Sequence, residues 1–447
     1  MPDHHQENKR QLEREGALVR ALGTWGLSAA IVNITIGAGI FRLPSSVAAS
    51  LGAAAPAAYL LCAVAMGLIV LCFADAGSRV AMTGGPYAYV EVAFGPLVGF
   101  VSGVLLWAGL TSALAAVTSF FVDSLAALVP ALSGTPAKVV IVVVLIALAT
   151  LNVRGVRNAN RFNEVMTVAK LLPLALLVIA GSFAMHRENL VWQQPPSIIA
   201  VGRASSVLIF AFLGVEAALV PSGEVKEPAR TAPRAIFLAI GFVAVLYVAL
   251  QIVAQGVLGP ALASARTPVA DAGGQALGAW GRTLILVGST VSMFGYVSGM
   301  TLAVPRMLFA FARDGFLPRA VAAIHPRFRT PHWAITIQTV IVGVLATSGK
   351  FEALAINANG LVLLVYAACC LSTVQLRRRD VRAGGIPFGG PAPSVVPWLA
   401  LAVIVSLLAT LKRGERLALL AVAVAAVLVY AVTSTRRSEP VPAPAGD

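Results

Sequence analysis

The feature that most constrains how this chain can fold is a series of long segments without a charged side chain. The first of them, residues 43–74, runs for 32 residues without Asp, Glu, Lys or Arg. A helix that crosses the hydrocarbon core of a bilayer needs about 20 predominantly apolar residues, so segments of this kind can span a membrane. The others are residues 92–122, 235–265, 283–305, 353–376, 383–411 and 417–435.

Composition supports this interpretation. Hydrophobic residues make up 58% of the 447 residues, and charged residues make up only 12%. A water-soluble domain of this size could not cover its surface with so little charge. Backbone polar groups in lipid must be satisfied internally, which favours helices, and the alternating pattern of an outer-membrane barrel is absent. We therefore predict an all-α polytopic membrane protein.

Counting the apolar segments predicts twelve transmembrane helices between two tails. We expect a cytoplasmic N-terminal tail at residues 1–22, a core of ten helices at residues 23–380, two further helices at residues 381–435 and a disordered cytoplasmic tail at residues 436–447. The first tail is charged and precedes no cleavable signal pattern. The predicted span centres are Ala30, Leu68, Leu110, Val144, Ala175, Leu213, Ala244, Ser292, Val340, Val365, Val403 and Ala425.

The basic residues predict the orientation. With the N-terminus inside, the inner loops and tails hold 21 of the 33 Lys and Arg residues and the outer loops hold 9, while Arg42, Lys170 and Arg306 fall within spans. The positive-inside rule then places both termini in the cytoplasm. We expect the protein to lie in the cytoplasmic (inner) membrane. Membrane topology also accounts for the net charge of +14, so no nucleic-acid partner is expected.

One apolar segment interrupts itself. The stretch "NITIGAGIFRLP" holds Gly37 and Gly39 two residues apart, with Pro44 about a turn later. A glycine inside a helix costs about 1 kcal/mol relative to alanine, so we expect the first span to be discontinuous around Gly37. Irregular backbone at membrane depth is tolerated where it lines a cavity or is buried in protein.

The sixth span has the same character. Only residues 204–215 are uncharged before Glu216, so this span must contain Gly214, Glu216 and Pro221. The first span runs outward and the sixth inward, which is the pattern of an inverted repeat of five helices plus five. We place the two repeats at about residues 23–182 and 203–380, with a binding site between the two breaks.

The breaks predict a ligand. Unwound backbone exposes amide N–H groups that attract a carboxylate and carbonyl groups that attract an ammonium. A zwitterion that carries both groups, such as an α-amino acid, fits this site without a charged side chain. The glycines leave the backbone open to close approach. The alternative is that "GAG" is only a helix-packing motif of small residues.

Five stretches together resemble the amino acid–polyamine–organocation transporter superfamily, whose members have the inverted-repeat fold of the leucine transporter. The resemblance covers residues from about 24 to about 320 in the family order. It implies a secondary transporter, of unspecified substrate and direction. The stretches are "IGAGIFRLP", "TGGPYAYVEVAFG", "LNVRGVRNANRFNEVMTVAKLLPL", "FAFLGVEAALVPSGEVKEPARTAPRA" and "PRMLFAFARDGFLP".

The resemblance also implies the substrate site. Amides of Ala38 and Gly39 would hold the carboxylate, carbonyls of both breaks would hold the amino group, and Phe210 would close over the substrate. The third span lacks the polar residues of relatives with cationic substrates, which favours a neutral side chain, with Tyr296 as a polar exception. The implied substrate-binding residues are Thr35, Ile36, Gly37, Ala38, Gly39, Phe210, Ala211, Leu213, Gly109, Ala113, Tyr296 and Met300.

Coupling and gating are assigned to Lys170, Glu216 and Phe210. In proton-dependent relatives a lysine in the motif of Lys170 takes the place of sodium, so we expect its amine at the carbonyls around Ile36 and Gly37. The alternative is a lysine that extends to the membrane surface. Glu216 should be hydrogen-bonded, because a buried carboxylate is costly without partners, and it acts either in gating or pH sensing or in a purely structural network.

Other functional classes remain as alternatives. An enzyme is not expected, because ionisable residues inside spans are few, and neither a cofactor nor a metal is predicted. A channel would lack paired breaks, whereas an exchanger of cationic substrates or a receptor-like relative that does not transport stays open. The expected partners are an amino acid, protons and the bilayer, with a monomer or homodimer. No disulfide-linked partner is expected, because all four cysteines lie in apolar segments.

Overall fold

The structure is a computed structural model that describes residues 23–80, 85–154, 159–192, 195–218, 227–328, 330–382 and 387–434. The predicted tails lie outside the described residues, and so do Gly84 and Pro221. The described part of the chain contains helices and no strand.

The helices of the first half follow the apolar segments. Their bounds are α2 Thr24–Thr35, α3 Gly39–Leu51, η1 Gly52–Ala54, α4 Ala55–Arg79, α5 Pro86–Phe94, α6 Pro96–Leu128, η2 Pro130–Leu132, α7 Thr135–Arg154, α8 Ala159–Phe183 and η3 Arg187–Leu190.

The second half is also helical. Its bounds are α9 Ile198–Leu208, η4 Ile209–Phe212, α10 Val215–Ala218, α11 Pro228–Leu258, η6 Gly259–Ser264, α12 Pro268–Leu277, α13 Ala279–Ala303, α14 Pro305–Arg313, η7 Arg319–Ala322, α15 His332–Ser348, α16 Phe351–Arg378, α17 Val396–Ala409 and α18 Arg413–Ser434.

Seven stretches of the described residues are helical, long and apolar enough to cross a membrane. Shorter apolar helices lie at Val168–Phe183, Ile198–Phe212, His332–Ser348 and Val396–Ala409. Together these segments make the chain a multi-pass membrane protein. The seven long stretches are Gly39–Arg79, Pro96–Leu128, Thr135–Arg154, Arg230–Ser264, Ala279–Arg313, Phe351–Arg378 and Arg413–Thr433.

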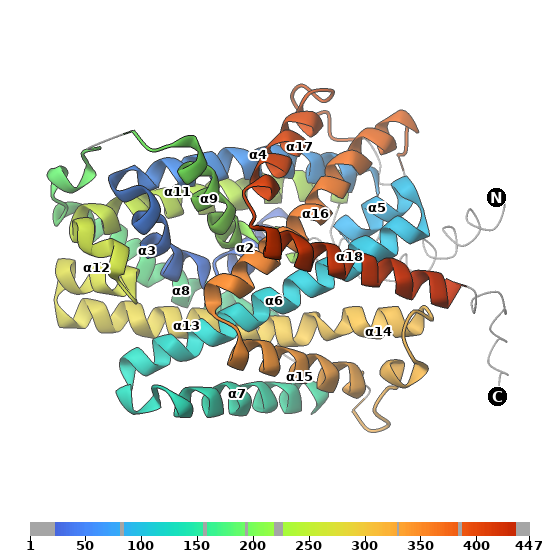
Figure 1. Cartoon of the computed structure of the whole chain (residues 1–447), viewed down its shortest axis with the longest axis horizontal. Helices are drawn as coiled ribbons and strands as arrows, with labels where there is room; N and C mark the ends of the chain where they lie inside the picture. Colours follow the sequence, from blue (N-terminus) through green and yellow to red (C-terminus); the bar gives the residue numbers. More distant parts are fainter. Residues whose placement is uncertain are drawn as a thin grey trace.

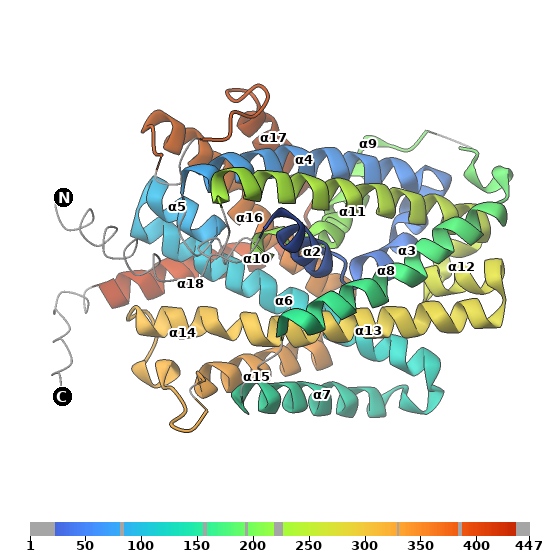
Figure 2. The same cartoon turned by 180° about the vertical axis from the view of Figure 1, so that it is seen from behind.

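The interrupted helices lie at the centre of the molecule. Long helices run beside one another along its length, with α4 and α11 on one side of α2 and with α6 and α13 on the other (Figures 1 and 2). The side chains of Ile36, Ile40 and Leu43 are fully buried there. Lipid-facing apolar residues lie at the periphery, as on α18, where Leu420 and Leu428 are exposed. The breaks therefore face protein and not lipid, as irregular backbone at membrane depth requires.

These bounds show the local structure around Pro44 and after Gly85. Pro44 does not end a helix, because it lies inside α3, which continues to Leu51. The interruption is therefore confined to residues 36–38. The stretch after Gly85 forms a short helix, α5 at Pro86–Phe94.

Candidate functional site

The first break separates α2 from α3. The Ile36 amide donates to the Val32 carbonyl (3.0 Å) and the Gly37 amide to the Thr35 carbonyl (2.9 Å), after which the chain leaves the helical path. Helix α3 begins at Gly39. The first N–H groups of a helix have no intrahelical partner, and they carry the positive end of its dipole. This end of α3 therefore carries the positive partial charge that would favour an anion.

The second break separates α9 from α10. A short 3-10 turn, η4, follows α9 and leads to a turn at Leu213 and Gly214. Gly214 has φ +119°, a conformation that residues with a side chain rarely adopt. Both interruptions therefore lie where the sequence predicts them.

The two breaks touch each other. A Cβ atom added to Gly39 would lie 2.6 Å from the Ala211 Cα, and one added to Gly214 would lie 2.7 Å from the Ile34 Cγ2. Neither position has room for a side chain. The Tyr247 hydroxyl joins the breaks, because it lies 3.1 Å from the Thr35 carbonyl oxygen and 2.9 Å from that of Ala211.

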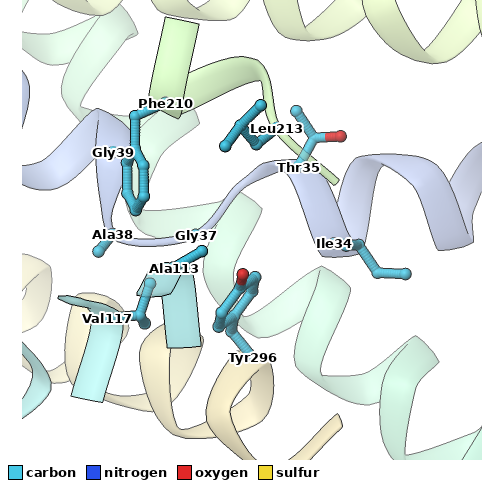
Figure 3. Close-up of a pocket in the computed structure, with 10 residues that line it drawn as sticks. All are labelled: Ile34, Thr35, Gly37, Ala38, Gly39, Ala113, Val117, Phe210, Leu213 and Tyr296. Carbon is cyan, nitrogen blue, oxygen red and sulfur yellow. The ribbon is translucent and has the colours of Figure 1, made fainter. Parts of the chain in front are cut away.

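A small cavity lies beside the contact between the breaks (Figure 3). Phe210 and Leu213 lie on one side of the first break, and Ala113, Val117 and Tyr296 lie on the other (Figure 3). Its volume is about 10 Å³, which holds about one water molecule. A ligand the size of an amino acid would therefore fit only if the surrounding elements separated. The lining residues are Ile34, Thr35, Gly37, Ala38, Gly39, Ala113, Val117, Phe210, Leu213 and Tyr296.

Four residues of the predicted set do not line this cavity. Gly109 faces α16 instead, since an added Cβ would lie 2.7 Å from the Val362 Cγ2. Met300 is buried elsewhere in the core. The carbonyls of Ile36 and Ala211 accept hydrogen bonds from other side chains. Sequence reasoning missed Ile34, Val117 and the Tyr247 hydroxyl, and a tyrosine within the uncharged run 235–265 was the available signal for Tyr247.

Lys170 reaches the first break from α8. Its side chain is 1% exposed, and Nζ donates to the carbonyl oxygens of Asn33 (2.8 Å) and Ile36 (3.0 Å). Ser292 Oγ lies 3.4 Å from the same Ile36 oxygen. The amine thus points where the sequence predicts, and a lysine that extends to the membrane surface is ruled out in this structure.

Glu216 lies just after the second break and is fully buried. The Gly214 N–H donates to both carboxylate oxygens, at 3.1 and 3.0 Å, and the Tyr366 hydroxyl of α16 donates to Oε2 at 2.5 Å. These are the partners that a buried carboxylate needs. The carboxylate also fixes the turn at Gly214, because it holds the amide of that residue.

An ion pair and an aromatic pair link α3 and η4 to the start of α16. Arg42 Nη2 lies 2.8 Å from Glu352 Oε1, and the ring of Phe210 packs edge-on against Phe351 at 5.5 Å between centroids. Arg42 is partly exposed. In the described part of the chain, no three His, Cys, Asp or Glu residues form a group that could hold a metal ion.

The chain is similar to known transporters along nearly its whole length. A model of a family described as amino acid permease matches residues 22–435. The methylthioribose transporter of Bacillus subtilis (strain 168) is 27% identical over 94% of this chain and 95% of its own length. The branched-chain amino acid permease of the same organism is 25% identical over 87% of each chain. The large neutral amino acids transporter small subunit 2 of Rattus norvegicus is 30% identical over 82% of this chain and 70% of its own length.

Proposed function

Because the chain belongs to the amino acid permease family, we propose that it is a secondary active transporter that carries amino acids across the cytoplasmic membrane. Its family and relatives are transporters, so the chain is a transporter and not an enzyme. The observation that carries the proposal is the contact between two broken helices beside one cavity. Amides at the start of α3 would bind the substrate carboxylate, and free carbonyls of the breaks would bind its ammonium.

We further propose that the substrate side chain is neutral. The residues that line the described cavity beyond the breaks are apolar, except for the uncharged phenol of Tyr296. A guanidinium or a second ammonium would need a carboxylate, because burial of an unpaired charge is costly. Glu216 is already engaged by Gly214 and Tyr366. An exchanger of cationic substrates is the less favoured alternative.

Proton coupling through Lys170 is part of the proposal. The ammonium donates to two carbonyls of the first break, and charge-assisted hydrogen bonds are stronger than neutral ones. Loss of its proton would weaken this hold and shift the break between two arrangements. No sodium ion is then required. For Glu216 we propose a role in gating or pH sensing, which a changed pH profile of uptake by Glu216→Gln would support and an unchanged profile with full activity would contradict.

The same reasoning gives a transport cycle. Twelve spans with an inverted repeat and cytoplasmic termini would let the elements around the breaks move relative to the rest of the bundle. The ion pair of Arg42 with Glu352 and the ring contact of Phe210 with Phe351 would close the outer side. The small cavity supports a closed arrangement of the site.

Uptake into proteoliposomes tests the proposal. Purified protein is reconstituted, and radiolabelled leucine is supplied outside with and without an acidic external pH, in sodium or in potassium buffer. We expect uptake that an acidic exterior accelerates, that sodium does not affect, and that other neutral amino acids inhibit. Inhibition by arginine or diamines alone would support the cationic alternative. Inhibition by methylthioribose alone would contradict an amino acid substrate. No uptake of any compound would support a receptor-like relative.

A further inference from the structure

Helix α16 carries a polar side chain at every seventh position, in a helix whose apolar composition makes polar residues costly. The four residues are Glu352, Asn359, Tyr366 and Thr373, and we call them the α16 stripe. Seven residues are close to two helical turns, so the four side chains lie near one face.

Each member of the α16 stripe bonds to one of the interrupted helices or to α4. Glu352 pairs with Arg42 of α3, and Tyr366 donates to Glu216 of α10. Thr373 Oγ1 lies 3.1 Å from the Cys72 carbonyl oxygen of α4 and 3.0 Å from the Cys369 carbonyl oxygen of its own helix. Such contacts on one face indicate that α16 is fitted to the interrupted helices and to α4.

Asn359 contacts the end of α9 directly before the second break. Its Nδ2 donates to the carbonyl oxygens of Ser206 (2.6 Å) and Val207 (3.2 Å), and the side chain is 1% exposed. Helix α9 ends at Leu208, and the last four carbonyls of an α-helix lack regular intrahelical partners. Asn359 therefore supplies a side-chain donor to carbonyl groups at the C-terminal end of α9.

Lys170 does the same at the first break. Helix α2 ends at Thr35, and Lys170 binds the carbonyl of Asn33, two residues before that end. Asn359 binds the carbonyl of Ser206, two residues before the end of α9 at Leu208. In the proposed inverted repeat, α8 and α16 occupy corresponding places, so Lys170 and Asn359 would be counterparts. The ammonium of Lys170 can lose a proton, whereas the amide of Asn359 cannot.

We propose that Asn359 is a positioning residue that holds the second break as Lys170 holds the first, and that the α16 stripe ties both halves of that break to α16. This inference rests on the proposed transport function. Asn359 does not line the described cavity, so it acts on the arrangement of the break and not on the substrate. With Tyr366 two turns away on the other half, α16 spans the break.

The test uses two nearly isosteric variants, Asn359→Asp and Asn359→Leu. An ionised Asp cannot donate to the Ser206 and Val207 carbonyls and repels them, a protonated Asp can donate, and Leu never donates. The described groups bonded to the Asn359 side chain, the Ser206 and Val207 carbonyls, bear no charge, and its Oδ1 has no hydrogen-bond partner among the described residues. We expect the maximal rate of both variants at pH 8 to fall about tenfold, as for loss of a buried hydrogen bond, with KM changed less than about threefold.

At pH 5 the Asp variant should recover severalfold relative to wild type at the same pH, and the Leu variant should not. The matched control is Gln338→Glu, which places a carboxyl at another buried amide, on α15, that bonds to Trp107 and Thr111 and to neither break. Its activity relative to wild type should not depend on pH. Full activity of both Asn359 variants, or equal loss without recovery of the Asp variant, would overturn the role of Asn359.

A second readout does not depend on transport. Hydrogen exchange in detergent should quicken about tenfold in peptides that cover the second break, residues 205–214, in Asn359→Leu, and should stay unchanged at the first break, residues 31–39. Unchanged exchange at the second break would overturn the inference. A wild-type protein that transports nothing while exchange responds as expected would contradict the proposed function and leave the positioning role supported.

Discussion

At the scale of single residues, the first break depends on side chains that bond to its carbonyl groups, among them Lys170 and Tyr247. Lys170 binds the oxygens of Asn33 and Ile36, and Tyr247 binds that of Thr35. An amine can exchange its proton near neutral pH when its surroundings favour the uncharged form, whereas a phenol does not. Under the proposed coupling, Lys170 is the group at this break through which a proton gradient would act.

Substitution of Lys170 tests that assignment. Lys170→Met keeps a long unbranched side chain and removes the amine. Proton-driven uptake should fall by about tenfold, within the usual range of coupling energies, and the remaining uptake should no longer depend on pH. The measurement is initial uptake from pH 5 to pH 8, with Lys138→Met at an exposed position of α7 as the control. A pH profile unchanged from wild type would show that Lys170 does not couple protons to transport.

Gly39 shows how closely the two breaks approach. An alanine Cβ there would lie 2.6 Å from the Ala211 Cα and 3.1 Å from its amide nitrogen. Because these are backbone atoms, the breaks must separate to relieve the overlap.

Gly39→Ala should therefore lower the free energy of unfolding by about 1–3 kcal/mol, the usual cost of overpacking. Thermal unfolding in detergent measures this effect. Gly67→Ala in α4 is the control, since an added Cβ there meets no atom within 4 Å and alanine is the better helix former. Equal unfolding temperatures for the two variants would contradict the close contact of the breaks.

At the scale of elements, α11 and α16 hold the breaks from two directions. Helix α11 contributes Tyr247, which joins Thr35 of the first break to Ala211 of the second. Helix α16 contributes Asn359 and Tyr366, which hold the two halves of the second break. The interrupted segments depend on these neighbours, because they lack a continuous series of backbone hydrogen bonds of their own.

Removal of the Tyr247 hydroxyl tests the role of α11. Tyr247→Phe keeps the ring, which packs edge-on against Phe212 at 5.3 Å between centroids. It removes the hydroxyl hydrogen that the buried carbonyls of Thr35 and Ala211 share. Substrate affinity should weaken by about five- to tenfold while the protein stays folded. Tyr59→Phe is the matched control, because the buried Tyr59 hydroxyl has no partner among the described residues. Equal affinities for both variants would show that the bridge between the breaks is not required for binding.

The sequence predicts elements better than it predicts side-chain partners. Eleven of the twelve predicted span centres fall in helices, and the twelfth, Leu213, falls in the turn of the second break. The length of an apolar run and the position of a glycine are local properties, so they can be read directly. The carbonyl that Lys170 binds was predicted from a family resemblance, not from local chemistry.

Partners across helices were missed for a physical reason. Gly109 was expected in the pocket, but the rotation of α6 turns it toward Val362. The Tyr247 contact depends on how α11 packs against two segments 36 and 212 residues away. Hydropathy carries no information on helix rotation when all faces are apolar. The spacing of seven in the α16 stripe was a signal in the sequence that could have indicated a common face.

At the scale of the whole molecule, the site is closed in this structure. A cavity of about 10 Å³ is far below the several hundred Å³ of a typical ligand pocket. In the proposed cycle, opening on the outer side would require the separation of Arg42 from Glu352 and of Phe210 from Phe351. Both contacts join a broken helix to α16, so a displacement between these elements opens the cavity.

The central claim is that the two breaks recognise the charged groups of an amino acid with backbone atoms. The most direct measurement is competition against bound radiolabelled leucine by isoamylamine, which lacks the carboxylate, and by 4-methylpentanoate, which lacks the ammonium. Unlabelled leucine is the positive control. Each analogue should bind at least about 100-fold more weakly than leucine, because a site built for both groups leaves buried polar atoms unpaired when one is missing. Competition by either analogue at the concentrations at which leucine competes would contradict the claim.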